Sequence, residues 1–309
     1  MNTETDRYFC FLCEASGNSV SMYARLNSVS NAEAAQALME YCNIYPMPLP
    51  PRSEASKEKD PKPISERHDV YFEMLGHLSL SAKHLDDLRG RGLSDERISQ
   101  NKYRTLPQSE QSRRFLAGIL ADFHDLNGIP GFYTDKTGKW NIDGKSGLLI
   151  PVCDMNGYIQ GMQVRLDDSD SVESGRRYRW LSSRYKDNGT RSGNWIHVTG
   201  NVSSKTTYLT EGPLKGDVAS YLDGDALFVC VAGINSTDGL TGVIKSLGIS
   251  EIALAFDMDR FTNKQVRDGY ERIKKTVSRI FNTNMRSLKW NLDYKGIDDY
   301  YLARQKTAA

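Results

Sequence analysis

The chain has no apolar run of the roughly 18 residues that a membrane-spanning helix needs. It also lacks a basic start followed by an apolar stretch, which would mark a secretory signal peptide. Neither sign of charge dominates, since 40 Lys and Arg face 39 Asp and Glu. We therefore expect a cytoplasmic protein with no membrane partner, in which any affinity for nucleic acid comes from local clusters of charge.

Motifs for several common chemistries are missing as well. The five cysteines are scattered, and Cys42, Cys153 and Cys230 stand singly in apolar or mixed stretches, which is typical of reduced core residues. No pair of histidines has metal-ligand spacing, and no G-x-S-x-G segment surrounds a serine. The sequence thus gives no support to covalent hydrolase chemistry.

Composition and periodicity predict four segments. Residues 1–45 form a small unit with helical periodicity after a Cys-containing start, and residues 46–69, rich in Pro, Ser, Lys and Glu, form a linker. Residues 70–205 begin with helical spacing and continue with apolar runs cut by an Asp-Met-Asn-Gly turn, as in a β-hairpin. In residues 206–303 strands alternate with helices, which predicts an α/β fold with a parallel sheet.

Acidic residues follow two strands of this predicted sheet. Glu211 ends the strand in TYLTEG, and Asp257 and Asp259 end the strand in IALAFDMD. Ligands of open parallel sheets gather beyond the carboxyl ends of the strands, and residues two apart in an extended segment share one side. A single acidic residue after a strand more often caps the next helix. Three of them at two strand ends favour a site for Mg²⁺ or Mn²⁺, which prefer carboxylate oxygens.

The segments YLTEGPLKGDVAS, FVCVAGINS and IALAFDMDR resemble the Toprim domain shared by bacterial-type primases, topoisomerases and some nucleases. The resemblance implies that Glu211 acts in acid/base or metal chemistry and that Asp257 and Asp259 bind Mg²⁺. YKGIDDYYL resembles a primase K-D-P-D-E-Y segment, which implies an additional carboxylate from Asp298 or Asp299.

Two segments upstream, LLIPVCDMNGYIQGMQVRLDD and RRYRWLSS, resemble the part of bacterial replicative primases that precedes Toprim. Lys215 departs from the family pattern, because many primases carry an acidic residue there, and the second metal site is therefore not implied. The resemblance, with the interleaved basic and aromatic residues, predicts contacts to nucleic acid or nucleotide from Arg165, Arg177, Arg179, Lys186 and Lys215. For the individual arginines other than Arg165, ordinary surface charge is an equal alternative.

The start of the chain, YFCFLCEASGNS and the helices after it, resembles the second half of a primase zinc ribbon. Structural zinc needs four ligands, and only Cys10 and Cys13 are present, so we expect no bound zinc. The segment from VYFEMLGHLSLSAKHL to NKYRTLP resembles primase-like proteins of phages, plasmids and integrative elements.

The expected fold is therefore α/β: a Toprim-type parallel sheet flanked by helices, preceded by a mixed α+β primase-like subdomain and a small half-ribbon unit. The leading functional hypothesis is a Mg²⁺-dependent DNA primase-like nucleotidyltransferase that makes short primers on single-stranded DNA from nucleotide triphosphates, in mobile-element replication, with a replicative helicase as a further partner. The alternatives are a metal-dependent Toprim nuclease and an inactive protein that binds single-stranded nucleic acid.

Overall fold

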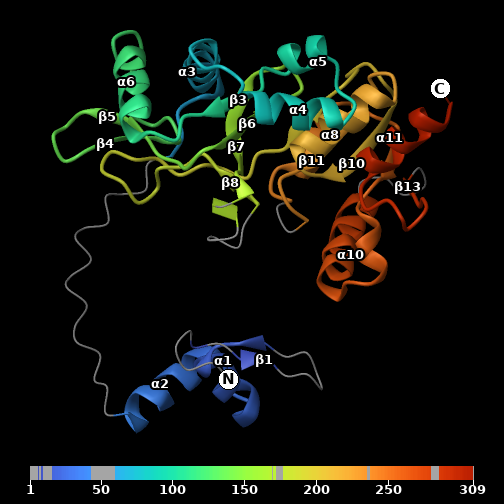
Figure 1. Ribbon diagram of the computed structural model, residues 1–309. Helices are drawn as coiled ribbons and strands as arrows, with labels where there is room; N and C mark the ends of the chain where they lie inside the picture. Colours follow the sequence, from blue (N-terminus) through green and yellow to red (C-terminus); the bar gives the residue numbers. More distant parts are fainter. Residues whose placement is uncertain are drawn as a thin grey trace. The chain divides into compact units, whose positions relative to one another are not determined.

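The structure is a computed structural model (Figure 1), in which the chain divides into two units, residues 1–57 and 58–309. Cys10 and Cys13, which carry the predicted half ribbon, lie outside the described residues, so that part of the interpretation stays a prediction. The structure describes residues 6, 8–9, 16–42, 60–168, 170–171, 177–234, 237–279 and 285–308.

The first unit contains a short antiparallel hairpin followed by two helices. Both helices begin with a capping box, in which the side chains of the N-cap residue and of the third helical residue each accept a hydrogen bond from the backbone N–H of the other. This confirms the helical periodicity predicted there. The elements are β1 (Tyr8–Phe9), β2 (Ser16–Gly17), α1 (Ser19–Asn27) and α2 (Asn31–Tyr41).

The second unit begins with helices, and the first of them starts earlier than predicted. Pro63 precedes the first helical turn, where the missing N–H of proline costs nothing, and the helix buries Val70 and Tyr71. It therefore takes residues 64–69 from the predicted linker 46–69: Glu66 and Asp69 lie on its exposed side, and the buried Arg67 donates hydrogen bonds to the Lys62 and Gln160 carbonyls. The helices are α3 (Ile64–Gly76), α4 (Ala82–Gly90), α5 (Asp95–Gln100) and α6 (Glu110–Ala121).

A mixed region follows these helices and contains a four-stranded antiparallel sheet with the order β3-β6-β7-β8. Its long strands β6 and β7 are joined through the Asp-Met-Asn-Gly turn, which confirms the predicted hairpin. The strands are β3 (Arg104–Leu106), β6 (Gly147–Cys153), β7 (Ile159–Leu166) and β8 (Tyr178–Trp180), with a separate hairpin of β4 (Phe132–Thr134) and β5 (Trp140–Ile142).

The second sheet has five strands in the order β13-β12-β10-β11-β9. The first four in this order run parallel, as predicted, whereas β9 pairs antiparallel with β11 and lies upstream of the predicted boundary at residue 206. The strands are β9 (His197–Thr199), β10 (Thr206–Glu211), β11 (Phe228–Val231), β12 (Glu251–Leu254) and β13 (Met285–Ser287). Around them lie α8 (Pro213–Leu222), α9 (Leu240–Ser246), the 3₁₀ helix η1 (Met258–Phe261), α10 (Lys264–Ser278) and α11 (Ile297–Ala308).

One apolar cluster joins the two sheets. Leu148 and Ile150 of β6 pack in the same buried cluster as Leu214 and Val218 of α8 and Phe228 of β11. Burial of these side chains stabilises the contact by roughly 1.5–3 kcal/mol for each one fully removed from water. Helix α8 is therefore held between the sheets, and its first turn faces the carboxyl ends of the parallel strands (Figure 1).

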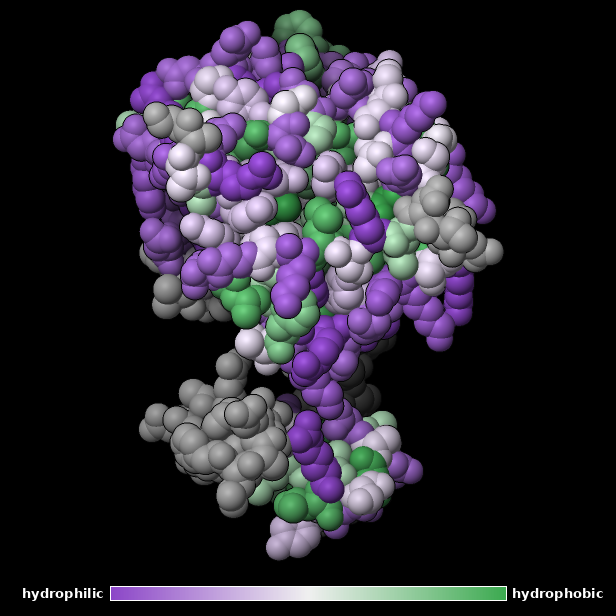
Figure 2. All heavy atoms as spheres, turned by 90° about the vertical axis from the view of Figure 1, so that its right-hand side faces the viewer, coloured by the Kyte–Doolittle hydropathy of each residue, from purple (hydrophilic) through white to green (hydrophobic). Residues whose placement is uncertain are grey.

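The surface of the second unit is mixed in character. The face shown in Figure 2 is mainly hydrophilic, and hydrophobic side chains show there only in small areas. Within the described ranges, no helix combines the length and the apolar character required of a membrane span.

Candidate active site

The strand ends place two of the predicted carboxylates side by side in the sheet order. Glu211 is the last residue of β10, the central strand, and Asp257 follows the neighbouring strand β12, whose pairing continues through the Ala255 N–H to the Leu209 carbonyl at 2.8 Å. Asp257 precedes η1, and Asp259 stands in its first turn. Both segments thus end at the same edge of the sheet, where ligands of such folds bind.

Two glycines place α8, and with it Lys215, over this edge. Gly212 has a φ of 87°, a left-handed conformation that allows the abrupt turn from β10 into the helix. Gly216 approaches β11 so closely that an added Cβ would overlap the Cys230 sulfur. The position of Lys215, between these glycines, is therefore set by backbone packing.

Arg260 holds the loop that carries Asp257 and Asp259. The Arg260 guanidinium is buried, donates hydrogen bonds to the backbone carbonyls of Phe256, Asp257 and Leu288, and lies 4.9 Å from the ring centroid of Tyr270. The Met258 N–H also donates to the Lys295 carbonyl at 2.9 Å. These contacts fix the direction of the two aspartates.

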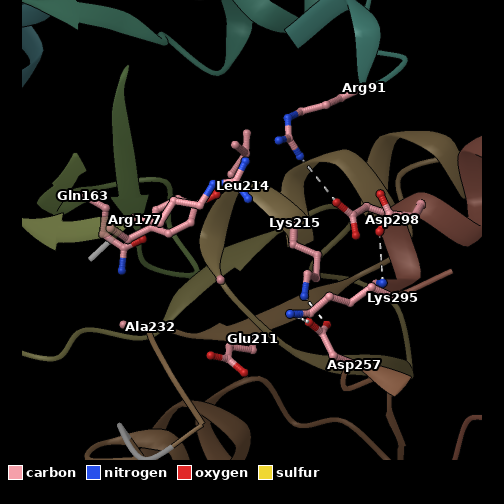
Figure 3. A pocket seen from close by; sticks show the side chains of 14 residues that line it. Arg91, Gln163, Arg177, Glu211, Leu214, Lys215, Ala232, Asp257, Lys295 and Asp298 are labelled. Atoms are coloured by element: carbon pink, nitrogen blue, oxygen red, sulfur yellow. Dashed lines mark hydrogen bonds and ion pairs between the residues drawn. The ribbon is translucent and has the colours of Figure 1, made fainter. Parts of the chain in front are cut away.

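A cavity of about 450 Å³ opens between the two sheets at this edge (Figure 3). It is lined by charged side chains of both signs from elements far apart in the sequence. The lining residues are Arg91, Gln163, Arg177, Tyr178, Glu211, Gly212, Leu214, Lys215, Ala232, Asp257, Lys295, Gly296, Asp298 and Asp299.

Two lysines bind the aspartates at the end of β12. The Lys215 ammonium contacts Asp257 Oδ1 directly, while Lys295 Nζ lies 4.0 Å from Asp257 Oδ2 and 3.1 Å from Asp259 Oδ2. The Lys215 side chain is 19% exposed and that of Lys295 is 67% exposed. Lys215 is thus part of the protein interior, whereas Lys295 reaches the same carboxylates from solvent.

The clustered charges shift the ionisation of the site. Burial raises the pKa of the Glu211 carboxyl, and the charge of Asp257 raises it further against the opposing effect of Lys215. Burial also raises the pKa of Asp298 to about 6. Burial lowers the pKa of the Lys215 amine, but the neighbouring carboxylates, Asp257 above all, outweigh this and raise it. Lys215 is therefore a fixed positive charge.

The donor chemistry suits a divalent cation such as Mg²⁺, although a complete ligand set is not assembled. Asp259 Oδ1 and Asp298 Oδ1 are buried and have no hydrogen-bond partner, and such hard oxygens are what Mg²⁺ binds. Within the described part of the chain, however, no three carboxylate, histidine or cysteine side chains converge closely enough to hold a metal ion. Lys215 and Lys295 occupy both oxygens of Asp257 and the other oxygen of Asp259. The predicted metal role of Glu211, Asp257, Asp259 and Asp298 therefore stays a prediction.

Most of the predicted basic contacts lie next to this cavity. Arg177 lines it, and a second cavity of about 750 Å³ continues from Tyr178, which lines both. Arg179 and Lys186 line the second cavity; Arg179 lies 3.1 Å from Asp143, and the Lys186 ammonium lies 5.3 Å from the ring centroid of Tyr133. We call this second cavity the basic groove; its other lining residues include Lys145, Trp180, Arg184, Tyr185 and Arg191.

Arg165 does not line either cavity, although its partner across β7 and β8, Tyr178, lines both. Its guanidinium forms a bidentate ion pair with Asp87 of α4, with Nη2 at 2.9 Å from Oδ1. The pair ties β7 to α4. The nucleic-acid contact predicted for Arg165 stays a prediction. Its carboxylate partner could not be found from local sequence, because 78 residues separate the two.

The Asp87 ion pair predicts an acid-sensitive contribution to stability. Burial alone would raise the pKa of Asp87, but the hydrogen bond from Arg165 and the charges of Arg165 and Arg91 lower it to about 2. A lowered folded-state pKa stabilises the protein above the ordinary value near 3.8 and loses that effect as pH falls toward 2. We expect Asp87→Asn to lower the free energy of unfolding by up to about 2 kcal/mol at neutral pH.

Urea unfolding of both proteins between about pH 7 and pH 3 measures this effect. The difference between wild type and Asp87→Asn should narrow as pH falls below about 5, because the carboxyl of Asp87 becomes protonated in the unfolded wild-type chain while it stays ionised in the folded protein. A difference that stays constant down to about pH 3 would show that packing, and not charge, makes the contribution.

Three polar or charged lining residues were not singled out from the sequence. Lys295 stands in the segment YKGIDDYYL, whose lysine was a usable signal. Arg91 follows α4 and lies 3.8 Å from Asp298, and Gln163 comes from the middle of β7. Neither belongs to a local pattern of site residues: Arg91 reaches the cavity through the packing of α4 against α8, and Gln163 through the packing of the two sheets.

No protein-family model matches the chain, and no curated protein matches it. Solved structures do match. The DnaG primase catalytic domain bound to ssDNA superposes with a TM-score of 0.59 at 13% identity, over 79% of this chain and 76% of that one. A DNA primase domain from Pseudomonas aeruginosa gives 0.58 at 14% identity, over 78% and 77%.

The Aquifex aeolicus primase, with its zinc-binding and RNA polymerase domains, matches over 97% of this chain and 70% of that one, with a TM-score of 0.54 and 13% identity. The chain therefore has a mixed α/β fold that matches the Toprim-type catalytic core of primases, as predicted. At these identities the likeness concerns the fold.

Proposed function

We propose that this protein is a primase-like nucleotidyltransferase that synthesises short primers on single-stranded DNA from nucleotide triphosphates. The observation that carries the proposal is the cavity between the two sheets. There the strand-end carboxylates Glu211 and Asp257 face basic side chains, and the basic groove leads away from it. A primase catalytic-core fold supports the same reaction, and so does the ssDNA bound to one of the similar structures.

Each group of residues has a distinct part in this proposal. The basic groove holds the template backbone, with Tyr178 and Trp180 available for base stacking. Arg177 and Lys295 line the cavity and are suited to bind the phosphates of an incoming nucleotide. Glu211, whose pKa is raised by burial, would accept the proton of the attacking 3′-hydroxyl.

A divalent cation, Mg²⁺ or Mn²⁺, would be held by Asp259, which has a buried oxygen without a hydrogen-bond partner, together with Asp257 or Glu211. Asp298, which has another such oxygen on the other side of Lys215, would be an additional ligand. When bound, it would supply charge neutralisation for phosphoryl transfer. The protein itself contributes the orientation of nucleotide and template, since the cavity walls come from two packed sheets.

The wider role follows from the resemblance of residues 70–107 to proteins of mobile elements: we propose replication of a phage, plasmid or integrative element, with a replicative helicase as partner. We also propose that the N-terminal unit ends at residue 45 and that the Toprim-type segment ends at residue 303.

The direct test is synthesis by the whole protein on a single-stranded template with labelled nucleotides and Mg²⁺ or Mn²⁺. We expect oligomers shorter than the template that depend on both template and cation. Template binding without any oligomer would contradict the proposal and favour the inactive binding protein. Nicking of the template without nucleotides would favour the nuclease.

The basic groove makes a separate prediction about salt. Lys186 is exposed there and, by this account, binds one backbone phosphate. We expect Lys186→Gln to weaken binding of single-stranded DNA for all sequences alike and to reduce the slope of log K against log salt by about 0.7. Fluorescence anisotropy over a salt series measures both quantities. Lys275→Gln, an exposed position on α10, is the control, and an equal change in that variant would argue against the groove.

A further inference from the structure

The Lys215 ammonium lies inside the acidic cluster of the cavity. It contacts Asp257 Oδ1, and the charges of Asp298 and Glu211 also act on it. Figure 3 shows the Lys215 side chain extending from α8 toward Asp257, between Asp298 and Glu211. A buried ammonium is costly unless it is paired, so the carboxylates and this lysine stabilise each other.

The backbone fixes this charge in place. Gly212 and Gly216 set the course of α8 on either side of Lys215, as described above. The aliphatic stem of Lys215 lies against Gly296, where an added Cβ would stand 3.1 Å from Lys215 Cε. Lys295 reaches the same carboxylates from an exposed position, which leaves its side chain free to move. Of these two lysines, Lys215 is therefore the one that behaves as a fixed part of the site.

The carboxylate that Lys215 contacts is the one nearest to Glu211 in the sheet order, because β12 and β10 are neighbours. An ion bridging these strand ends would need the Asp257 oxygen that the ammonium occupies. Asp298, only 6% exposed, keeps one buried oxygen without a partner on the far side of the lysine. The carboxylates of the cluster thus carry more negative charge than one divalent ion would neutralise. The Lys215 ammonium occupies the position of one cation among them.

We propose that Lys215 is a tethered cation that takes the place of one divalent ion, so that removing its charge creates an additional divalent-cation site at Asp257. The inference rests on the proposed function in that it assigns cation binding to the same carboxylates. With the Lys215 charge in place, the proposed active site would bind fewer divalent ions than its number of carboxylates would otherwise allow.

Mn²⁺ binding to the whole protein tests this, with free Mn²⁺ measured by electron paramagnetic resonance. We expect Lys215→Met to bind one more Mn²⁺ ion than wild type. Lys295→Met is the matched control: it removes the exposed lysine from the same carboxylates, and we expect no additional ion. Equal numbers of ions in wild type and Lys215→Met, or an additional ion in Lys295→Met alone, would overturn the inference.

Thermal unfolding provides a second readout that does not depend on counting ions. Without metal, Lys215→Met should melt below wild type, because Asp257 loses its partner, and Mn²⁺ should raise its melting temperature more than that of wild type. If Lys215→Met does not fold, Lys215→Met/Asp257→Asn removes both charges, and Lys215→Ser leaves room for a hydrated ion. The double variant should gain no ion, and Lys215→Ser should gain one; the opposite result would overturn the inference.

The two proposals fail separately. Loss of the proposed function would appear as absent primer synthesis by wild type, which leaves the Mn²⁺ counts valid. Failure of the inference would appear in the Mn²⁺ counts, while primer synthesis and its dependence on Asp257 would be unaffected.

Discussion

Asp257→Asn is expected to reduce primer synthesis by at least about 10²-fold, the size of effect seen when one preorganised electrostatic group is removed from an active site. Asparagine keeps the shape of the side chain but removes the negative charge at the end of β12, where Lys215 and Lys295 converge. Rates of oligomer formation under saturating nucleotide and template measure the loss.

The same substitution leaves the buried Lys215 without its partner, which can cost about 3 kcal/mol of stability. Circular dichroism and urea unfolding should therefore accompany the assay, and Lys215→Met/Asp257→Asn, which removes both charges, separates unfolding from lost chemistry. Asp268→Asn, an exposed residue on α10, is the control for a carboxylate outside the site. Oligomer formation at the wild-type rate by folded Asp257→Asn would mean that this carboxylate has no catalytic part.

Gly216→Ala is expected to destabilise the protein by about 3 kcal/mol, because the new Cβ would overlap the Cys230 sulfur where α8 packs on β11. Relief of that overlap would push α8, and Lys215 with it, away from the end of the sheet. Urea unfolding measures the loss of free energy.

A second substitution makes this prediction specific. In Gly216→Ala/Cys230→Ala the sulfur is gone, and the remaining contacts, to the Cβ of residue 230 at 3.5 Å and to Thr210 Cγ2 at 3.7 Å, are ordinary. The double variant should recover much of the stability lost in Gly216→Ala. Gly242→Ala in α9, where nothing lies within 4 Å of the added Cβ, should be neutral or slightly stabilising. A double variant as unstable as Gly216→Ala would show that overlap with the Cys230 sulfur is not the cause of the lost stability.

The strands and their ends were predictable because local patterns encode them. Apolar runs followed by Glu211 and by Asp257 give both the period of a parallel sheet and the position of its carboxyl edge. The hairpin of β6 and β7 is predictable for the same reason, since its turn residues interrupt two apolar strands. The upstream strand β9 was missed, because a three-residue strand carries too little periodicity.

The charge pairing of the site was not predictable, because it depends on tertiary packing. The partner of Lys215 is 42 residues away, and Arg91 reaches the cavity only because α4 and α8 share one apolar cluster. Arg165 is paired with Asp87, 78 residues away, a partner that no local pattern indicates. A pattern of charges along the chain shows which residue types are present, whereas their partners are set by the fold.

The central claim is that the carboxylates at the ends of β10 and β12, with Asp298, form a cation-dependent nucleotidyl-transfer site. Anomalous diffraction from crystals of the protein grown with MnCl₂ tests it most directly. A manganese peak beside Asp259, in contact with Asp298, Asp257 or Glu211, is the predicted result. Crystals that contain manganese elsewhere, or none, with these four side chains uncoordinated, would contradict the account.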